Sequence, residues 1–479
     1  MTVQLLIEDG IAEVRAALIE DGRLVEIAIH RRGDPVAVGG LFQGRVARLV
    51  PGINAAFIDI GRNQSGFLAA RDAQALRPAE RRPGGDGVPQ IGACLTEGQS
   101  VTVQITKQPI VDKRPRLTAN LALPGRYLVY RPLGAGVSVS KRILEGPERQ
   151  RWLDWTPPAA SGGWIIRTAA ADRPVADIDR DAAWLLGRWR EISRAATGAP
   201  APLGAVEADL ESLIRDLAPV GGGEVVLDSI DALTRARAYA RRSAPDLEGR
   251  LRGHEGSVAL FVASGVEAEI EAALSARVDL ASGGAITIEE TQALTAIDVD
   301  SGSFTSGRSQ AGTALRVNCE AAEEAARQLR LRRIGGIIVI DFILQDSRAD
   351  RDRVVAVLGA ALARDSVATR MLGMNEFGLV ELTRRRDGES LAGQLLARPA
   401  RPEPRPTPAQ AVAEALRRAE REAADLPPGP LLVRLPPEIA ALVTPAEVGE
   451  LGRRAARAAR IEPVPSLVVG EVEVLVRHG

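Results

Sequence analysis

Two apolar runs that each contain a terminal aspartate decide the fold of this chain: TQALTAIDVDSG at residues 291–302 and GGIIVIDF at residues 335–342. Between them, residues 310–332 carry apolar side chains at helical spacing, and a Gly-Gly pair follows. A strand, a crossover helix and a second strand form a right-handed βαβ unit, with both strand ends at one edge of the sheet. The pattern therefore predicts an α/β sheet with acidic side chains at one edge.

Three carboxylates fall at this predicted edge. Asp298 and Asp300 alternate within one strand and so share a face, and Asp341 ends the second strand. Ligands commonly bind at the C-terminal ends of strands in α/β sheets, so two of these groups could share a divalent cation. Oxygen ligands without nearby His or Cys favour Mg²⁺ or Mn²⁺ over Zn²⁺. On spacing alone, the alternative that each aspartate only forms a turn or a helix cap stays open.

The composition excludes several classes of protein. A chain of 479 residues is long enough for two to four domains, and no apolar run approaches the ~18 residues of a membrane span. The first residues carry no secretion signal, so we expect a cytoplasmic protein without a membrane span. Two cysteines, Cys94 and Cys319, lie too far apart in sequence to indicate a disulfide framework or a cysteine zinc site.

Residues 39–123 contain five short strand-like segments separated by Gly, Pro and Asn, which is typical of an OB-type barrel. Residues 35–125 hold 11 basic and 6 acidic side chains, although the whole chain has a net charge of −1. Phe57 and Phe67 fall on neighbouring predicted strands, where aromatic rings can stack bases. Two alternatives stay open: both rings belong to the core, and Lys113, Arg114 and Arg116 form a solvated charge run.

The remaining segments give a coarse plan. Residues 1–32 suggest two strands around a turn, residues 126–275 mix strands and helices, residues 393–408 suggest a proline-rich linker, and residues 408–424 suggest a helix that opens a small terminal unit. Arg167 and Thr168 follow an apolar strand and are candidates to hold a terminal phosphate. A basic cluster is either a polar helix face or an RNA contact: Arg327, Arg330, Arg332 and Arg333.

Taken together, these segments resemble the catalytic half of the bacterial ribonuclease E/G family. The motifs that carry the resemblance cover most of residues 1–390: NAAFIDIGRNQSGFL, EGQSVTVQITK, WIIRTAA, TQALTAIDVDSG, EAAEEAARQLRLRRIGGIIVIDF and FGLVELTRRR. The resemblance implies an α/β and α+β multidomain protein. Its parts are an RNase H-like fold at 1–35 and 209–276, an S-one-type OB barrel at 36–122, a 5′-sensor region at 123–208, a DNase I-like catalytic subdomain at 277–392, a linker at 393–407 and a small C-terminal domain at 408–479.

The resemblance also assigns roles to individual residues. Asp298 and Asp341 match the two metal-binding aspartates of the family, and Asp300, where relatives usually have Asn, is expected to assist them as a direct or indirect ligand. Phe57 and Phe67 match the base-contacting aromatics, and Lys113 or Arg114 matches a basic RNA contact. Arg167 and Thr168 match the pair that recognises a 5′-monophosphate.

These matches imply a Mg²⁺-dependent endoribonuclease that cleaves single-stranded RNA. A second sensor arginine expected near residues 366–370 has no clear equivalent, since Arg370 is offset. The cysteine pair with which the family shares zinc between protomers is absent, so a homo-oligomer is not expected to form by a cysteine–zinc link. Two other functions stay open: a catalytically weak RNA-binding protein of the same fold, and a DNA nuclease.

Overall fold

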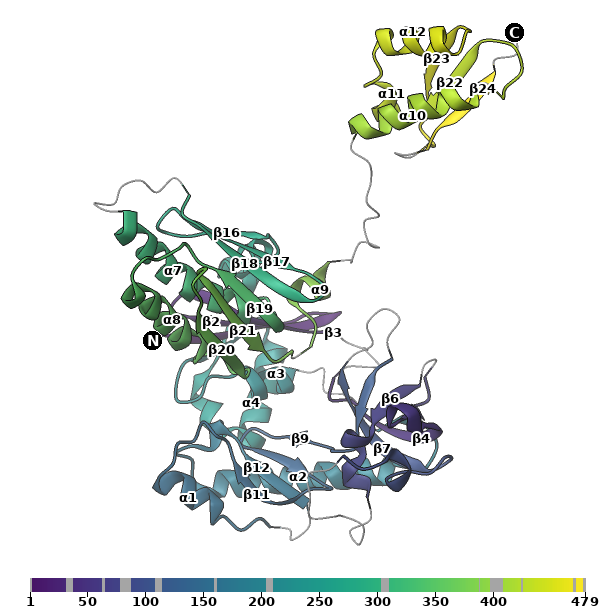
Figure 1. Cartoon of the computed structure of the whole chain (residues 1–479). Coiled ribbons are helices and arrows are strands. Elements are labelled where there is room, and N and C mark those ends of the chain that lie inside the picture. The colour runs from purple at the N-terminus through teal and green to yellow at the C-terminus, as the bar shows by residue number, and fades with distance from the viewer. Residues whose placement is uncertain are drawn as a thin grey trace. The chain divides into compact units, whose positions relative to one another are not determined.

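The computed structural model of the chain describes residues 2–31, 38–62, 65–77, 88–107, 114–158, 162–203, 210–302, 310–386, 388–396, 408–423, 425–467 and 471–476. The chain forms two compact units, Met1–Leu395 and Leu396–Gly479. Within the described ranges, no helix has both the length and the apolar character needed to cross a membrane. The described part of the larger unit contains four sheets, and Figure 1 shows their strands coloured from purple at the N-terminus to green.

The first sheet combines segments that lie far apart in the sequence. Its strand order is β15-β14-β1-β2-β3, and β1 pairs in parallel with β14. The strands are β1 (Val3–Asp9), β2 (Glu13–Glu20), β3 (Arg23–Arg31), β14 (Glu224–Leu227) and β15 (Leu251–Gly253). Two helices share a core with one face, α3 (Leu210–Leu217) and α4 (Ile230–Ser243). Two others share a core with the opposite face, α5 (Leu260–Ala263) and α6 (Val266–Ala272).

The prediction of two strands in residues 1–32 was wrong, because β2 is a third strand between β1 and β3. Its side chains enter two cores in turn: Ala16 and Leu18 pack with α3 and α4, whereas Ala17 and Ile19 pack with α5 and α6. A strand that is covered on both faces lacks a polar face, so it lacks the period-two alternation by which strands are recognised in a sequence.

The second sheet is a closed barrel made of the five predicted strands. They are β4 (Leu41–Val50), β5 (Ala55–Asp59), β6 (Gly66–Ala69), β7 (Ser100–Lys107) and β8 (Arg116–Thr118). The order β4-β5-β6-β8-β7 closes on itself through the pairing of β4 with β7, as in an OB-type barrel. A short strand, β13 (Ala201–Pro202), pairs with the outside edge of β4.

The third sheet belongs to a compact α+β region, as predicted. Its order is β11-β12-β10-β9. The elements are β9 (Leu123–Pro124), β10 (Leu128–Arg131), β11 (Ala135–Val139), β12 (Gly162–Ile166), α1 (Pro147–Leu153) and α2 (Val175–Ala195). The core between the sheet and α2 is aromatic, with Tyr130 and Trp155 both packed against Trp164.

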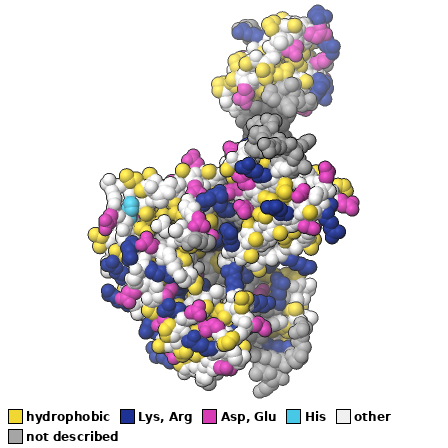
Figure 2. All heavy atoms as spheres, turned by 90° about the vertical axis from the view of Figure 1, so that its left-hand side faces the viewer, with side chains coloured by type: hydrophobic (Ala, Val, Ile, Leu, Met, Phe, Trp, Pro, Cys, Tyr) yellow, Lys and Arg dark blue, Asp and Glu magenta, His cyan; other side chains and the backbone are white. Residues whose placement is uncertain are grey.

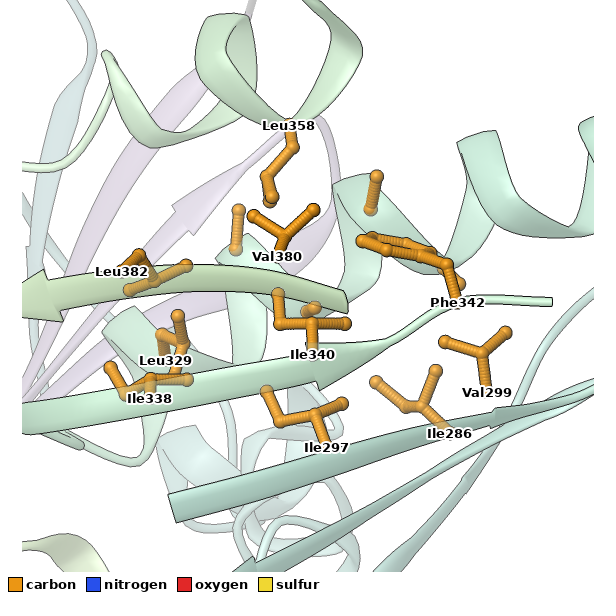
Figure 3. Close-up of a cluster of buried hydrophobic side chains, with 14 of the residues drawn as sticks. Ile286, Ile297, Val299, Leu329, Ile338, Ile340, Phe342, Leu358, Val380 and Leu382 are labelled. Carbon is orange, nitrogen blue, oxygen red and sulfur yellow. The ribbon is translucent and has the colours of Figure 1, made fainter. Parts of the chain in front are cut away.

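The fourth sheet contains the two apolar runs that end in aspartate. Its order is β16-β17-β18-β19-β21-β20, and β18 and β19 are parallel neighbours joined through α7, as the sequence predicts. The elements are β16 (Arg277–Asp279), β17 (Ala285–Glu290), β18 (Leu294–Asp300), β19 (Gly336–Asp341), β20 (Thr369–Met374), β21 (Leu379–Arg384), α7 (Gln310–Leu331) and α8 (Arg348–Leu362). Figure 3 shows the core that this sheet forms with the two helices, in which Ile297, Ile340 and Leu358 lie.

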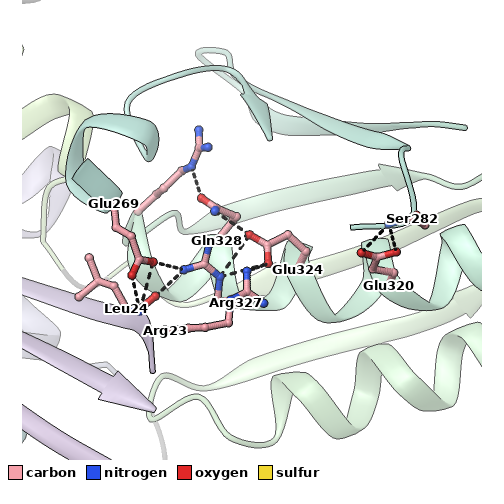
Figure 4. A network of polar contacts seen from close by, with 9 residues as sticks. Arg23, Leu24, Glu269, Ser282, Glu320, Glu324, Arg327 and Gln328 are labelled. Atoms are coloured by element: carbon pink, nitrogen blue, oxygen red, sulfur yellow. Dashed lines mark hydrogen bonds and ion pairs between the residues drawn. The ribbon is translucent and has the colours of Figure 1, made fainter. Parts of the chain in front are cut away.

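Charged side chains of α7 connect the fourth sheet to the first (Figure 4). The Arg327 guanidinium donates to the carboxylates of Glu324 and Glu269 and to the Leu24 carbonyl. Arg330 bridges two carboxylates of the first sheet, at 2.7 Å from Glu20 and 3.1 Å from Glu26. The basic cluster of α7 is therefore a structural contact between two sheets, and the RNA-contact alternative does not hold for Arg327 and Arg330.

The smaller unit has a three-stranded sheet in the order β23-β22-β24. Its elements are β22 (Leu431–Leu435), β23 (Ala459–Pro463), β24 (Glu473–Val476), α10 (Pro408–Glu422), α11 (Pro437–Ala440) and α12 (Pro445–Arg454). The predicted helix at 408–424 is confirmed as α10, whose Ala415 and Ala419 are fully buried. The larger unit ends with α9 (Leu391–Leu395), and most of the predicted linker lies outside the described residues.

Candidate active site and RNA interface

Asp298 and Asp341 lie directly opposite each other on the parallel strands β18 and β19. Both side chains are exposed, whereas the residues before them, Ile297 and Ile340, point into the core that α7 and α8 cover. Neighbouring strands are about 4.8 Å apart, so two aspartates in register on the same face bring their carboxylates within reach of one cation. The strand alternation thus places the pair on the face of the sheet opposite the buried core.

Asp300 is held differently. It shares the exposed face with Asp298, but its Oδ1 accepts the backbone N–H of Gly302 at 2.9 Å, in a turn in which Gly302 has a φ of 59°. Among the described residues, no three His, Cys, Asp or Glu side chains are grouped closely enough to hold a metal ion. The Asp300 carboxylate thus forms a turn at the end of β18, whereas Asp298 and Asp341 lie opposite each other on neighbouring strands.

The segment after Asp341 is fixed by a polar residue that falls within the apolar helical pattern of residues 310–332. Asn318 is fully buried in α7, and its side-chain amide makes two hydrogen bonds to the backbone of Ile343. Its Nδ2 donates to the Ile343 carbonyl at 2.7 Å, and its Oδ1 accepts the Ile343 N–H at 3.0 Å. An Asn in an otherwise apolar stripe was the available signal, because a buried amide needs partners. Asn318 therefore fixes the backbone two residues beyond Asp341.

The donor set suits a hard divalent cation. Two exposed carboxylates supply oxygen ligands and leave the remaining coordination positions to water or to phosphate oxygens, which is the arrangement that Mg²⁺ prefers. Neither member of the pair is a thiolate or an imidazole, the ligands that favour zinc. The residues therefore fit Mg²⁺ or Mn²⁺.

The barrel presents two aromatic rings on its outer surface. Phe57 and Phe67 are register partners on β5 and β6, with ring centroids 6.1 Å apart, and both are half-exposed. The alternative that they are core residues was wrong, because Ile58 and Leu68, which alternate with them, fill the barrel instead. Lys113, the predicted RNA contact next to them, lies outside the described residues.

Basic side chains surround these rings. The Arg114 guanidinium carbon lies 4.5 Å from the Phe57 ring centroid, and that of Arg116 lies 6.0 Å from the Phe67 centroid. Rings flanked by guanidinium groups can stack bases and attract phosphates at the same place. On the face drawn in Figure 2, Lys and Arg side chains gather around a hollow in the larger unit, which favours binding of a polyanion.

Arg167 and Thr168 follow β12, and both already have partners. Arg167 donates to the Gly125 carbonyl at 2.5 Å and to the Asp216 carboxylate at 3.0 Å. Burial opposes ionisation of Asp216, but Arg215 and Arg167 hold the pKa of this carboxyl below its usual value. The Thr168 hydroxyl lies 3.1 Å from that of Ser140. A phosphate bound here would therefore compete with Asp216 for Arg167.

A buried carboxylate supports the same corner. Asp181 is fully buried on α2, and its oxygens accept the backbone N–H groups of Tyr127 and Leu128 at 2.9 Å each. Burial raises the pKa of Asp181 to about 6. Gly125, two residues before Tyr127, lies so close that a Cβ atom there would be 2.5 Å from both Asp181 carboxylate oxygens. Asp181 thus fixes the loop whose Gly125 carbonyl binds Arg167.

The region expected to carry a second sensor arginine contains a different contact. Arg370 is exposed on β20, the edge strand of the fourth sheet. The segment just before it begins at Asp365, whose backbone carbonyl accepts a hydrogen bond from Arg142 of the third-sheet region. Arg142, two residues after Ser140, therefore contacts the segment next to residues 366–370, where a second sensor arginine was expected.

An open pair of carboxylates on an α/β sheet, in one unit with a barrel that exposes aromatic and basic side chains, is typical of enzymes that cut nucleic acids with a bound metal ion. Residues 122–387 match the model of the Ribonuclease E/G family. The chain belongs to the ribonuclease E/G family, which confirms the resemblance inferred from its motifs.

Individual relatives agree with this assignment. Ribonuclease G of Haemophilus influenzae is 35% identical over 395 residues, covering 81% of this chain and 80% of that protein. Ribonuclease G of Escherichia coli K12 is 36% identical over 401 residues, covering 82% and 81%. Ribonuclease E of a Nostoc species is 38% identical over 391 residues, covering 78% and 55%. A solved O-methyltransferase from Bacillus cereus matches with a TM-score of only 0.13 and 17% identity over 36% of this chain and 68% of that one, so it carries no argument.

Proposed function

We propose that the chain is an endoribonuclease that cleaves single-stranded RNA with Mg²⁺, for which Mn²⁺ can substitute. Membership of the ribonuclease E/G family supports the reaction class. The single observation that carries the proposal is the register of Asp298 opposite Asp341 on an exposed sheet face, because this arrangement suits one shared cation beside a phosphodiester.

In the proposed reaction, Asp298 and Asp341 hold the cation and Asp300 shapes the end of β18. A bound divalent cation lowers the pKa of a water molecule and stabilises negative charge on the phosphate. The water oxygen forms a bond to phosphorus as the bond to the 3′ oxygen breaks, and a proton passes to that oxygen. The products are a 3′-hydroxyl and a 5′-phosphate.

The proposal assigns the RNA strand to the barrel and its 5′ end to the third-sheet region. Phe57, Phe67 and Arg114, together with Lys113, would hold unpaired bases and phosphates. Arg167 and Thr168 would bind a 5′-monophosphate, with Asp216 as the competing anion. A 5′ phosphate would therefore stimulate cleavage without being essential for it.

The finer division of the fold is also part of the proposal. We assign residues 1–35 and 209–276 to an RNase H-like fold, 277–392 to a DNase I-like catalytic subdomain and 408–479 to a small C-terminal domain, on the strength of the family resemblance. The same resemblance supports a cytoplasmic location. Because the chain lacks the cysteine pair with which the family shares zinc, any homo-oligomer would form without a cysteine–zinc link.

The test is cleavage of a short, 5′-monophosphorylated, A/U-rich RNA by the full chain, with Mg²⁺ or with EDTA. We expect Asp298→Asn and Asp341→Asn each to reduce cleavage by about 100-fold or more, equivalent to about 2.7 kcal/mol, and to leave RNA binding intact. The matched control is Glu381→Gln, an exposed carboxylate on β21 that is not in register with the aspartate pair. This control should cleave normally.

Three results would contradict the proposal. If wild type binds the RNA and does not cut it with Mg²⁺, the chain is an RNA-binding protein of the same fold. If the deoxyribose version of the strand is cut equally well, it is a nuclease without preference for RNA. If Asp298→Asn and Glu381→Gln behave alike, the carboxylate pair is not the metal site.

A further inference from the structure

Phe377 is a large apolar side chain that the protein leaves uncovered. It is 79% exposed, whereas Phe42, Phe261 and Phe342 are at most 3% exposed. An aromatic ring that is 79% exposed can contribute more to a binding contact than an exposed Leu or Val, because aromatic rings dominate the energetics of contacts. The position of Phe377 in the fold indicates what it binds.

The ring belongs to the turn between β20 and β21, beside the carboxylate pair. Leu379, the first residue of β21, lies opposite Asp341 in the sheet. The Phe342 N–H, next to Asp341, donates to the carbonyl of Gly378 at 3.3 Å. Phe377 is two residues from Leu379, so the backbones of these two residues lie within about 7 Å of each other. Leu379 in turn lies one strand spacing, about 4.8 Å, from Asp341. The Phe377 backbone therefore lies within about 12 Å of Asp341.

The turn that carries Phe377 is rigidly built. The Asn375 Oδ1 accepts the backbone N–H of Phe377 at 2.9 Å and that of Leu379 at 3.0 Å. Gly378 has a φ of 87°, and a Cβ atom there would lie 2.9 Å from the Phe342 carbonyl oxygen. A positive φ and this close approach both require glycine. The backbone that carries the exposed ring is therefore fixed, so binding does not have to order the turn.

We propose that Phe377 is a stacking subsite for an unpaired base that flanks the cleaved phosphodiester. This inference rests on the proposed function, because it takes the aspartate pair as the place of cleavage. A Phe ring offers a π-face and no hydrogen-bonding group, so the subsite accepts any base and prefers those that stack strongly. It is a second aromatic contact with RNA, separate from the Phe57–Phe67 pair on the barrel. The barrel pair binds the RNA, whereas Phe377 positions the bound RNA next to Asp298 and Asp341.

The experiment places 2-aminopurine, a fluorescent base that is quenched by stacking, at successive positions around the cleavage point of the test RNA. Binding to the full chain is measured in EDTA, so that no cleavage occurs. We expect wild type and Phe377→Tyr to quench the probe at one position next to the cleavage point. Phe377→Ala and Phe377→Leu should lose most of that quenching, because Leu keeps the apolar bulk and not the ring. With Mg²⁺, both should lose roughly tenfold in kcat/KM on the unlabelled RNA.

The matched control is Leu372→Ala, which removes another exposed apolar side chain, 54% exposed, from β20. It should quench and cleave like wild type. The proposal is overturned if Phe377→Leu and wild type give the same quenching profile and rate. It is also overturned if Phe377→Ala changes the mass of the protein in solution without changing the profile, since the ring would then cover a protein contact. In both cases Asp298→Asn still separates active from inactive enzyme, so the proposed function is tested independently.

Discussion

Arg384 and Asp365 form a buried ion pair behind the fourth sheet, with Nε of Arg384 2.6 Å from Oδ2 of Asp365 and side-chain exposures of 4% and 3%. Arg384 also donates to the Ile334 carbonyl at 2.8 Å, at the entry to β19. The pair therefore connects the loop after α8 to the end of β21, and Arg384 also connects it to the start of β19, the strand that ends in Asp341. The same Asp365 accepts Arg142 through its backbone carbonyl.

Replacing Asp365 with Ala would leave the Arg384 charge buried without its partner. We expect a loss of about 3–5 kcal/mol in the free energy of unfolding, measured by urea denaturation. The control is Asp352→Ala, which breaks an exposed pair with Arg348 and should cost less than about 0.5 kcal/mol. Equal losses in the two variants would show that the Arg384–Asp365 pair is not buried as described.

Asp300→Asn tests whether the extra negative charge at the end of β18 changes the cleavage rate or the Mg²⁺ requirement. An Asn Oδ1 can still accept the Gly302 N–H, so the turn should persist. We expect cleavage within about threefold of wild type, together with a higher Mg²⁺ concentration for half-maximal rate, because one negative charge near the cation is removed. A Mg²⁺ titration of both proteins checks this. If Asp300→Asn is as inactive as Asp298→Asn, Asp300 is itself a ligand.

Arg114→Ala should weaken RNA binding to the barrel by about 1 kcal/mol, or roughly fivefold, because it removes both a phosphate attraction and the cation over Phe57. Fluorescence anisotropy over a range of salt concentrations should also show the slope of log K against log salt falling by about 1. Arg71→Ala is the control, since Arg71 is an exposed barrel arginine that pairs with Asp72. A smaller effect at Arg114 than at Arg71 would contradict the assignment of the barrel face.

The Arg167–Asp216 pair predicts opposite effects on 5′-end preference. Arg167→Ala should reduce the ratio of cleavage rates for 5′-monophosphate and 5′-hydroxyl RNA to about 1, because a charge-assisted contact is lost. Asp216→Asn should raise that ratio above the wild-type value, because it removes the competing carboxylate. The two rates are measured on otherwise identical strands. If both variants lower the ratio, the pair acts as a unit that supports the loop and does not compete with phosphate.

Asp181 gives the protein a pH-dependent contribution to stability. Burial raises the pKa of this carboxyl from 3.8 to about 6, so the folded protein binds more protons than the unfolded chain between these pH values. The stability contributed by the neutral form is therefore present below pH 3.8 and is lost as the pH rises to about 6, a change of about 3 kcal/mol for a shift of this size.

Asp181→Asn should remove this dependence. The free energy of unfolding of wild type relative to Asp181→Asn is expected to fall between pH 4 and pH 6.5 and to stay level above it, as measured by urea denaturation at several pH values. Asp179→Asn is the control, because Asp179 lies on the same helix, at the surface of the packed region, and accepts a hydrogen bond from Trp155. A constant difference across this pH range would contradict the raised pKa of Asp181.

The features that the sequence predicted are those set by local pattern. Alternation placed Asp298 and Asp341 at strand ends, and short apolar segments between turn residues gave the barrel that carries Phe57 and Phe67. Pattern alone failed at β2, which is apolar on both faces.

The contacts that tune the candidate site were not predictable in the same way. Arg167 meets Asp216 across 49 residues of sequence, and Arg142 meets Asp365 across 223. The local sequence around Arg167 and Arg142 does not indicate their partners, because tertiary packing determines which distant residues they contact. Asn318 was visible as a polar residue in an apolar stripe, but its partner, the Ile343 backbone, follows only from the packing of α7 against the end of β19.

The first sheet has a consequence for how the protein is made. β1 pairs on one side with β2, which follows it immediately, and on the other with β14, whose first residue is Glu224. A ribosome that adds about 5–20 residues per second delivers β14 roughly 10–40 s after β1. During that interval the emerging hairpin presents the unpaired edge of β1, which is a template for pairing with a neighbouring nascent chain.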